Sequence, residues 1–132
     1  MVGGLPARLS PTKTLRLHGW CEAGNDKPEL AGYGSDAGEL TALFKNGGDQ
    51  LLHPRLPCHV GQVLWAVRQE MARTVADVLS RRLRALVLDA PAAIEMAPQV
   101  ARLMAAELGR DGAWEKQQVS DFRALARSYL FA

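Results

Sequence analysis

Helix signals after residue 34 constrain the fold of this chain more than any other feature. In about five segments the apolar residues recur every three or four positions, and short loops with glycine or proline separate these segments. This spacing is typical of helices with one buried face, whereas a half-buried strand would alternate apolar and polar residues. Ser35 and Asp111 are good N-cap residues, and Gly109 is a typical stop signal. The sequence therefore predicts an all-α fold, a compact bundle of about five amphipathic helices.

The same signals give approximate helix boundaries. We expect helices over about 35–45, 59–71, 75–86, 90–108 and from 112 onward. Asp89 would cap the fourth helix, whose first turn accommodates Pro91 because the missing N–H is not needed there. Pro98 could divide that helix. Pro54 and Pro57 indicate a loop before the second helix.

The first 31 residues have a different composition. They contain four glycines and three prolines and no sustained helical period. This pattern predicts an extended arm with a short strand at 14–17. We expect the arm to be held less firmly than the helices, with Leu17 and Trp20 as apolar anchors. The predicted organisation is an arm over 1–31 and a helical domain over 32–132.

The run EMARTVADVLSRR, residues 70–82, carries the densest set of polar signals. Thr74 and Asp77 form a variant of the capping box, in which the hydroxyl accepts from a free backbone N–H and the carboxylate reaches back to the cap. Asp77 and Arg81 stand one turn apart in the favourable acid-before-base order. Such a pair is often only a solvated surface bridge. We predict instead a partly buried network that joins Glu70, Asp77, Arg81 and Arg82 where the second and third helices meet.

The same run resembles part of a known family. The pattern E-x-A-x-T-x-x-D-x-L-x-R-R is similar to the C-terminal helical domain of FAD-dependent glycerol-3-phosphate dehydrogenases and alpha-glycerophosphate oxidases. Three further segments agree in order: YGSDA at 33–37, WAVRQE at 65–70 and APQVARLMAAELG at 97–109. The resemblance covers about 32–130. The chain departs from the family pattern at Gln62, Leu83 and Arg110, where Glu, Thr and Trp are usual.

This resemblance implies a non-catalytic role. In the family a larger flavoprotein region precedes the helical domain and holds FAD and glycerol 3-phosphate, which is oxidised to dihydroxyacetone phosphate with electrons passed to quinone or oxygen. We therefore expect no cofactor in this chain, FAD in the full-length enzyme, and packing of the helical domain against the flavin domain. Arg81 or Arg82 would alternatively point to that domain or to a phosphate. An apolar surface left uncovered would favour self-association, and peripheral membrane attachment is an expectation for the full-length enzyme alone.

Composition and motifs disfavour several other functions. Lys and Arg number 16 against 14 Asp and Glu, so no excess of positive charge indicates nucleic-acid binding. Gly32, Gly34 and Gly38 lack a preceding buried strand and indicate a turn and helix start instead of a phosphate loop. Cys58, His59 and His53 lack the ordered four-ligand spacing of a zinc site. Without a signal sequence or an apolar span we expect a cytoplasmic protein with reduced Cys21 and Cys58.

Two other readings remain open at this point. One is a stand-alone helical module that binds a partner helix, and the other is a small enzyme whose pocket the sequence does not disclose. The leading hypothesis predicts that the purified chain is colourless and does not oxidise glycerol 3-phosphate, because it lacks a dinucleotide-binding turn and an identifiable general base.

Overall fold

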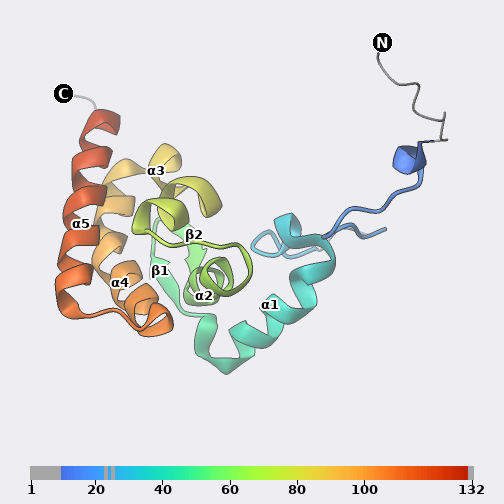
Figure 1. Ribbon diagram of the computed structural model, residues 1–132, viewed down its shortest axis with the longest axis horizontal. Helices are drawn as coiled ribbons and strands as arrows, with labels where there is room; N and C mark the ends of the chain where they lie inside the picture. The colour runs from blue at the N-terminus through green and yellow to red at the C-terminus, as the bar shows by residue number, and fades with distance from the viewer. Residues whose placement is uncertain (1–9, 23, 25, 131–132) are drawn as a thin grey trace, which may run out of the picture.

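The computed structural model describes residues 10–22, 24 and 26–130 of the chain. Helices α4 and α5 lie side by side at one end of the molecule, α2 occupies the middle, and α1 lies on the side from which the arm extends (Figure 1). The helices are α1 (Ala37–Leu43), α2 (Val60–Gln69), α3 (Ala85–Leu88), α4 (Ala90–Leu108) and α5 (Gly112–Ala126). Shorter helical turns are η1 (Pro11–Lys13), η2 (Ala31–Asp36), η3 (Phe44–Gly48), η4 (Asp77–Arg82) and η5 (Arg127–Tyr129). The predicted bundle of amphipathic helices is confirmed.

The two ends of α4 and the start of α5 are where the sequence places them. Asp89 accepts a hydrogen bond from the backbone N–H of Ala92, and Asp111 accepts one from Trp114, both at 2.9 Å. Gly109 ends α4 in the left-handed conformation, which glycine adopts without steric penalty. Pro98 does not divide α4, which continues through it as one helix.

The start of the first helix was predicted wrongly. Ser35 is not its N-cap, because the Ser35 hydroxyl donates to the Asp36 carboxylate at 3.2 Å and no side chain caps α1. The helical path begins earlier, with η2 at Ala31, and Leu30 just before it is buried. The helical turn η2 runs across the predicted boundary between residues 31 and 32. The division of the chain at that point stays a prediction.

A β-hairpin occupies the segment predicted to be a loop. Strands β1 (Leu51–His53) and β2 (Leu56–His59) pair in antiparallel fashion, with His53 opposite Leu56 across the turn. The buried side chains of the hairpin are Leu52, Leu56 and Cys58. Arg55 in the turn lies 3.3 Å from Asp89, and His53 lies 2.8 Å from Glu95. The hairpin is thereby fastened to the start of α4.

Two left-handed residues alter the predicted second and third helices. Met71 has φ 55°, and its side chain is 78% exposed, so it does not continue the apolar face of α2. Arg84 has φ 58° and separates the helical segment at 75–82 from α3. The predicted continuous helix over 75–86 is wrong for this reason.

The apolar side chains form two clusters. The larger one packs α2, η4, α4 and α5 around the hairpin, and its largest fully buried members include Leu79, Met96, Met104 and Phe122. The smaller one contains Leu30, Ala37, Leu40 and Trp65. Burying a side chain of this size stabilises the fold by about 1.5–3 kcal/mol. Since Trp65 belongs to α2, this helix carries both clusters.

Polar contacts hold the arm where apolar anchors were predicted. Leu17 is 73% exposed and Trp20 is 43% exposed, and residues 14–17 form no strand. The arm is held instead by the backbone N–H of Ser35, which donates to the Gly19 carbonyl at 3.1 Å, and by His18, 2.9 Å from Asp36. Gly34 permits this contact, because a Cβ on it would lie 1.7 Å from the Gly19 oxygen.

Candidate functional site

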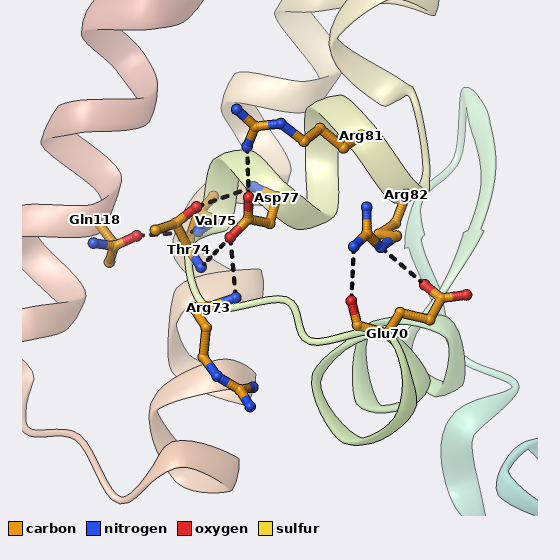
Figure 2. A network of polar contacts seen from close by, with 8 residues as sticks. All are labelled: Glu70, Arg73, Thr74, Val75, Asp77, Arg81, Arg82 and Gln118. Carbon is orange, nitrogen blue, oxygen red and sulfur yellow. Dashed lines mark hydrogen bonds and ion pairs between the residues drawn. The ribbon is translucent and has the colours of Figure 1, made fainter. Parts of the chain in front are cut away.

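The residues of the run at 70–82 separate into two polar clusters (Figure 2). The first surrounds Asp77. Its Oδ2 accepts from the backbone N–H groups of Arg73 and Thr74, both at 3.0 Å, and its Oδ1 accepts from Arg81 Nη1. The Thr74 hydroxyl accepts from the Asp77 N–H at 3.1 Å, which completes the predicted capping box. The cluster thus satisfies backbone donors at the start of a helix.

A residue that the sequence did not identify completes this helix start. The backbone N–H of Val75 donates to Oε1 of Gln118 on α5 at 3.1 Å. The first free donors of a helix need partners from outside it. Gln118 therefore joins the start of the segment at 75–82 to α5. No spacing in the sequence indicates a contact across 43 residues.

The second cluster joins Glu70 to Arg82. Arg82 Nη2 donates to the backbone carbonyl of Glu70 at 2.7 Å, and its Nε lies 3.4 Å from the Glu70 carboxylate. Figure 2 shows this guanidinium between the end of α2 and the end of η4. No hydrogen bond or ion pair joins the two clusters within the residues drawn there. The structure therefore places Glu70, Asp77, Arg81 and Arg82 in two separate groups and not in one continuous network.

The two carboxylates have opposite electrostatic surroundings. Burial would raise the pKa of Asp77, but the Arg73 and Thr74 N–H groups, Thr74 itself and Arg81 together outweigh burial and lower that pKa. Burial raises the pKa of Glu70, and Arg82 offsets this only in part. Hydrogen-bond donors thus stabilise the charged form of Asp77, whereas burial disfavours the charged form of Glu70.

One cavity of about 640 Å³ lies elsewhere on the molecule. The cavity beside these two clusters has a volume of about 500 Å³. The chain segments around it are the turn at 28–33, the hairpin, the end of α2 and the residues from 81 to 88. Its polar lining consists of Glu29, Tyr33, Cys58, Gln62, Glu70, Arg81, Arg82 and Arg84. Three of these are arginines within four positions, so both clusters contribute to one concave surface.

Arg84 is the lining residue that sequence reasoning missed. Among the described residues its guanidinium has no hydrogen bond or ion pair, while the guanidinium groups of Arg81 and Arg82 each contact a carboxylate. It occupies a left-handed position at a helix end, where glycine or asparagine is preferred. An arginine there carries backbone strain and an unpaired charge on the cavity wall.

Tyr33 and Cys58 are neutral members of the same lining. Burial is the main cause that raises the pKa of Tyr33 to about 12, and the nearby Glu70 charge adds to it. Burial also raises the pKa of the Cys58 thiol. Neither group is therefore an activated nucleophile or base near pH 7.

The described residues do not fit a flavin. A dinucleotide fold needs parallel strands with a glycine-rich turn before a helix, whereas the sheet in the described part of the chain is a two-stranded antiparallel hairpin. Gly34 lies against the backbone of Gly19 and so is used for the arm contact. Within residues 10–22, 24 and 26–130 no group of three or more His, Cys, Asp or Glu could hold a metal ion.

No helix that the structure describes is both long and apolar enough to cross a bilayer. Nothing in the described residues tests the predicted cytoplasmic location, which stays a prediction. The same is true of the predicted absence of nucleic-acid binding and of the predicted self-association.

Comparison with known proteins agrees with the resemblance in the run at 70–82. The family described as the C-terminal domain of alpha-glycerophosphate oxidase matches residues 29–118. A protein of Caenorhabditis elegans named probable glycerol-3-phosphate dehydrogenase, mitochondrial, is 42% identical over 74 residues, which is 56% of this chain and 10% of that protein. The matching segment thus spans about a tenth of that relative. No solved structure matches the chain significantly.

The matched residues include the hairpin, α1 to α4, both polar clusters and the first half of α5. They favour a domain of a larger enzyme over a stand-alone helical module. The chain belongs to the family of C-terminal domains of alpha-glycerophosphate oxidase.

Proposed function

We propose that this chain is the non-catalytic C-terminal domain of a FAD-dependent glycerol-3-phosphate dehydrogenase or oxidase. In the full-length enzyme, FAD and glycerol 3-phosphate are held by a preceding flavoprotein region, and this domain packs against that region and supports its fold. The observation that carries the proposal is the family match over residues 29–118. The sheet in the described part of the chain is a two-stranded hairpin and not a dinucleotide-binding fold, which agrees with a supporting role.

The place where the matched segment begins supports a contact beside the cavity of the two clusters. Glu29 is the first matched residue, and it lines that cavity. Its backbone carbonyl accepts from Gln62 Nε2 at 3.2 Å, so the start of the domain is fixed to α2. A region that precedes residue 29 in a longer chain would join the domain here. The arginines at 81, 82 and 84 lie on the same wall and would face it.

The proposal is tested by exchanging the domain in the nematode relative. One variant of that protein lacks the segment matched by this chain, a second carries residues 29–130 of this chain in its place so that α5 is complete, and a third carries an unrelated helical segment of equal length. We expect the first and third variants to lose bound flavin and oxidation of glycerol 3-phosphate with an artificial acceptor. The second should recover both in part, because the supporting contacts are restored.

Absorbance of bound flavin and the rate of oxidation are measured on each purified variant. Full flavin content and full activity in the variant without the segment would contradict a supporting role. Oxidation of glycerol 3-phosphate by the isolated chain would contradict the non-catalytic assignment.

A further inference from the structure

The outer side of α4 and α5 carries a second and larger groove. It has a volume of about 640 Å³ and lies between the two helices that pack side by side at one end of the molecule (Figure 1). Its lining contains four cations and one carboxylate: Arg102, Lys116, Arg123 and Arg127 with Glu115. The groove therefore has an excess of three positive charges in a chain whose formal net charge is only +2.

The cations of this groove differ in their partners from four other arginines of the chain. Arg55, Arg68, Arg81 and Arg82 each pair with a carboxylate of the same chain. Among the residues that the structure describes, no hydrogen bond or ion pair engages the four cations of the groove. All four side chains belong to exposed residues. Positive charges gathered without internal partners produce a local potential that attracts anions.

The shape of the groove favours an extended chain segment as the anion. Lys116, Arg123 and Arg127 follow one line along α5 and the first residue of η5 and span about 16 Å at the helical rise per residue. A stretch of about five residues in extended conformation covers the same length. Pro98 and Val119 give the groove an apolar floor between the charges. Carboxylates suit the rim, because arginine binds them through two parallel hydrogen bonds.

Other polyanions fit this surface less well. A lipid surface is flat, whereas these cations line a recess between two helices that also holds the Glu115 carboxylate. A single-stranded nucleic acid is usually bound with its bases stacked on aromatic side chains, and the groove lining contains none. We propose that this groove binds an extended acidic segment of a partner protein, with carboxylates at the arginine rim and an apolar side chain on the floor. This proposal is independent of the family assignment, since Arg123 and Arg127 lie outside the matched residues.

The test uses the chain itself and a fluorescein-labelled hexapeptide of sequence Glu-Leu-Glu-Glu-Leu-Glu, with binding followed by fluorescence anisotropy. The double variant Arg123→Glu with Arg127→Glu should bind at least about tenfold more weakly, because like charges then face each other. The matched control is Lys13→Glu with Arg110→Glu, which has the same net charge but leaves the groove intact. It should stay within about twofold of the unaltered chain. Circular dichroism confirms that both variants are folded.

A peptide with glutamine in place of glutamate should bind much more weakly, and added salt should weaken the binding of the acidic peptide. The proposal is overturned if the acidic peptide does not bind, if both double variants lose binding equally, or if the glutamine peptide binds as well. Vesicles of phosphatidylglycerol and a single-stranded oligonucleotide are measured in parallel. A groove-dependent affinity for either that exceeds the affinity for the acidic peptide also overturns it.

Discussion

Asp77 is the residue on which the start of the segment at 75–82 depends most. Its carboxylate accepts from two backbone N–H groups and from Arg81, and the side chain is 24% exposed. Replacement by alanine leaves those donors without a partner. We expect Asp77→Ala to lower the free energy of unfolding by about 1–2 kcal/mol at neutral pH, which is the range of a lost helix cap.

This loss should depend on pH in a defined direction. The pKa of Asp77 is lower in the folded chain than in the unfolded chain, so its contribution is fully present above the unfolded pKa and is lost as the pH falls through the folded pKa. The difference between the urea unfolding free energies of the unaltered chain and of Asp77→Ala should therefore be largest near pH 7 and smaller at an acid pH below the ordinary aspartate pKa of about 3.9. Asp121→Ala is the control, because this exposed carboxylate on α5 accepts a hydrogen bond from Gln117 alone among the described residues. A difference that is the same at both pH values would contradict the expectation.

Arg84 gives a second prediction at the scale of one residue. Its left-handed backbone is unfavourable for a residue with a Cβ by roughly 1 kcal/mol, and its side chain has no partner among the described residues. Arg84→Gly should therefore raise the thermal midpoint by a few degrees, although glycine makes the unfolded chain more flexible. Arg110→Gly, at a position without positive φ, should not raise it. A fall in the midpoint of Arg84→Gly would mean that the guanidinium has a structural partner.

At the scale of elements, one ion pair connects the middle helix to the longest one. Arg68 on α2 donates through Nε and Nη2 to the two oxygens of Glu107 on α4, both at 2.7 Å. The Arg68 hydrogen bond is the main cause that lowers the pKa of Glu107. Because Arg68 is 44% exposed, solvent screening limits the interaction.

A double-mutant cycle measures this pair. With Arg68→Ala, Glu107→Ala and the double variant, we expect a coupling energy of about 0.5–1 kcal/mol that falls as salt is added. The pair Arg55 and Glu95, 4.0 Å apart and both more exposed, serves as the comparison and should show less. Equal coupling for both pairs would contradict a role for the two-bond geometry.

The elements that the sequence predicted are those whose signals are local. Thr74, Asp89 and Asp111 each cap a helix through a backbone donor three residues away, so the type and position of these residues were sufficient. The hairpin was missed because each strand is only three or four residues long and its stability comes from contacts with α4. Short strands of this kind are marginal alone.

The candidate site was predictable only in part for the same reason. The Asp77 cluster lies within a few residues of sequence. In contrast, the Glu70 and Arg82 contact spans 12 residues and depends on a left-handed turn at Met71. Methionine and arginine are not typical residues for such turns, so neither Met71 nor Arg84 marked a helix end in the sequence.

At the scale of the whole molecule, the arm and the body differ in how they are held. The body has two apolar clusters joined by α2, whereas a hydrogen bond from Ser35 to Gly19 and an ion pair of His18 with Asp36 join residues 14–20 to the body. Segments with few buried apolar contacts open at low free energy. We expect limited proteolysis to cut first before residue 30, with the helices from α1 onward cut much later.

Gly34→Ala should make those first cuts faster, because a Cβ there meets the Gly19 carbonyl and the arm must move away. Gly38→Ala is the matched control, since a Cβ at Gly38 meets no atom within 4 Å. First cuts within α2 or α4, or equal rates in the two variants, would contradict this account of the arm. Mass spectrometry of the early fragments identifies the sites.

The fluorescence of Trp65 reports on the place where the two apolar clusters meet on α2. Trp65 is 5% exposed, and the Tyr33 ring lies edge-on to it with centroids 6.4 Å apart. Excitation absorbed by this tyrosine passes readily to an indole so close by, and the shielded indole emits at shorter wavelength than one in water. With the pKa of Tyr33 at about 12, the phenol stays protonated through the neutral range and its anion does not quench the indole. The fold thus contains its own optical probe at the point where the turn after the arm meets α2.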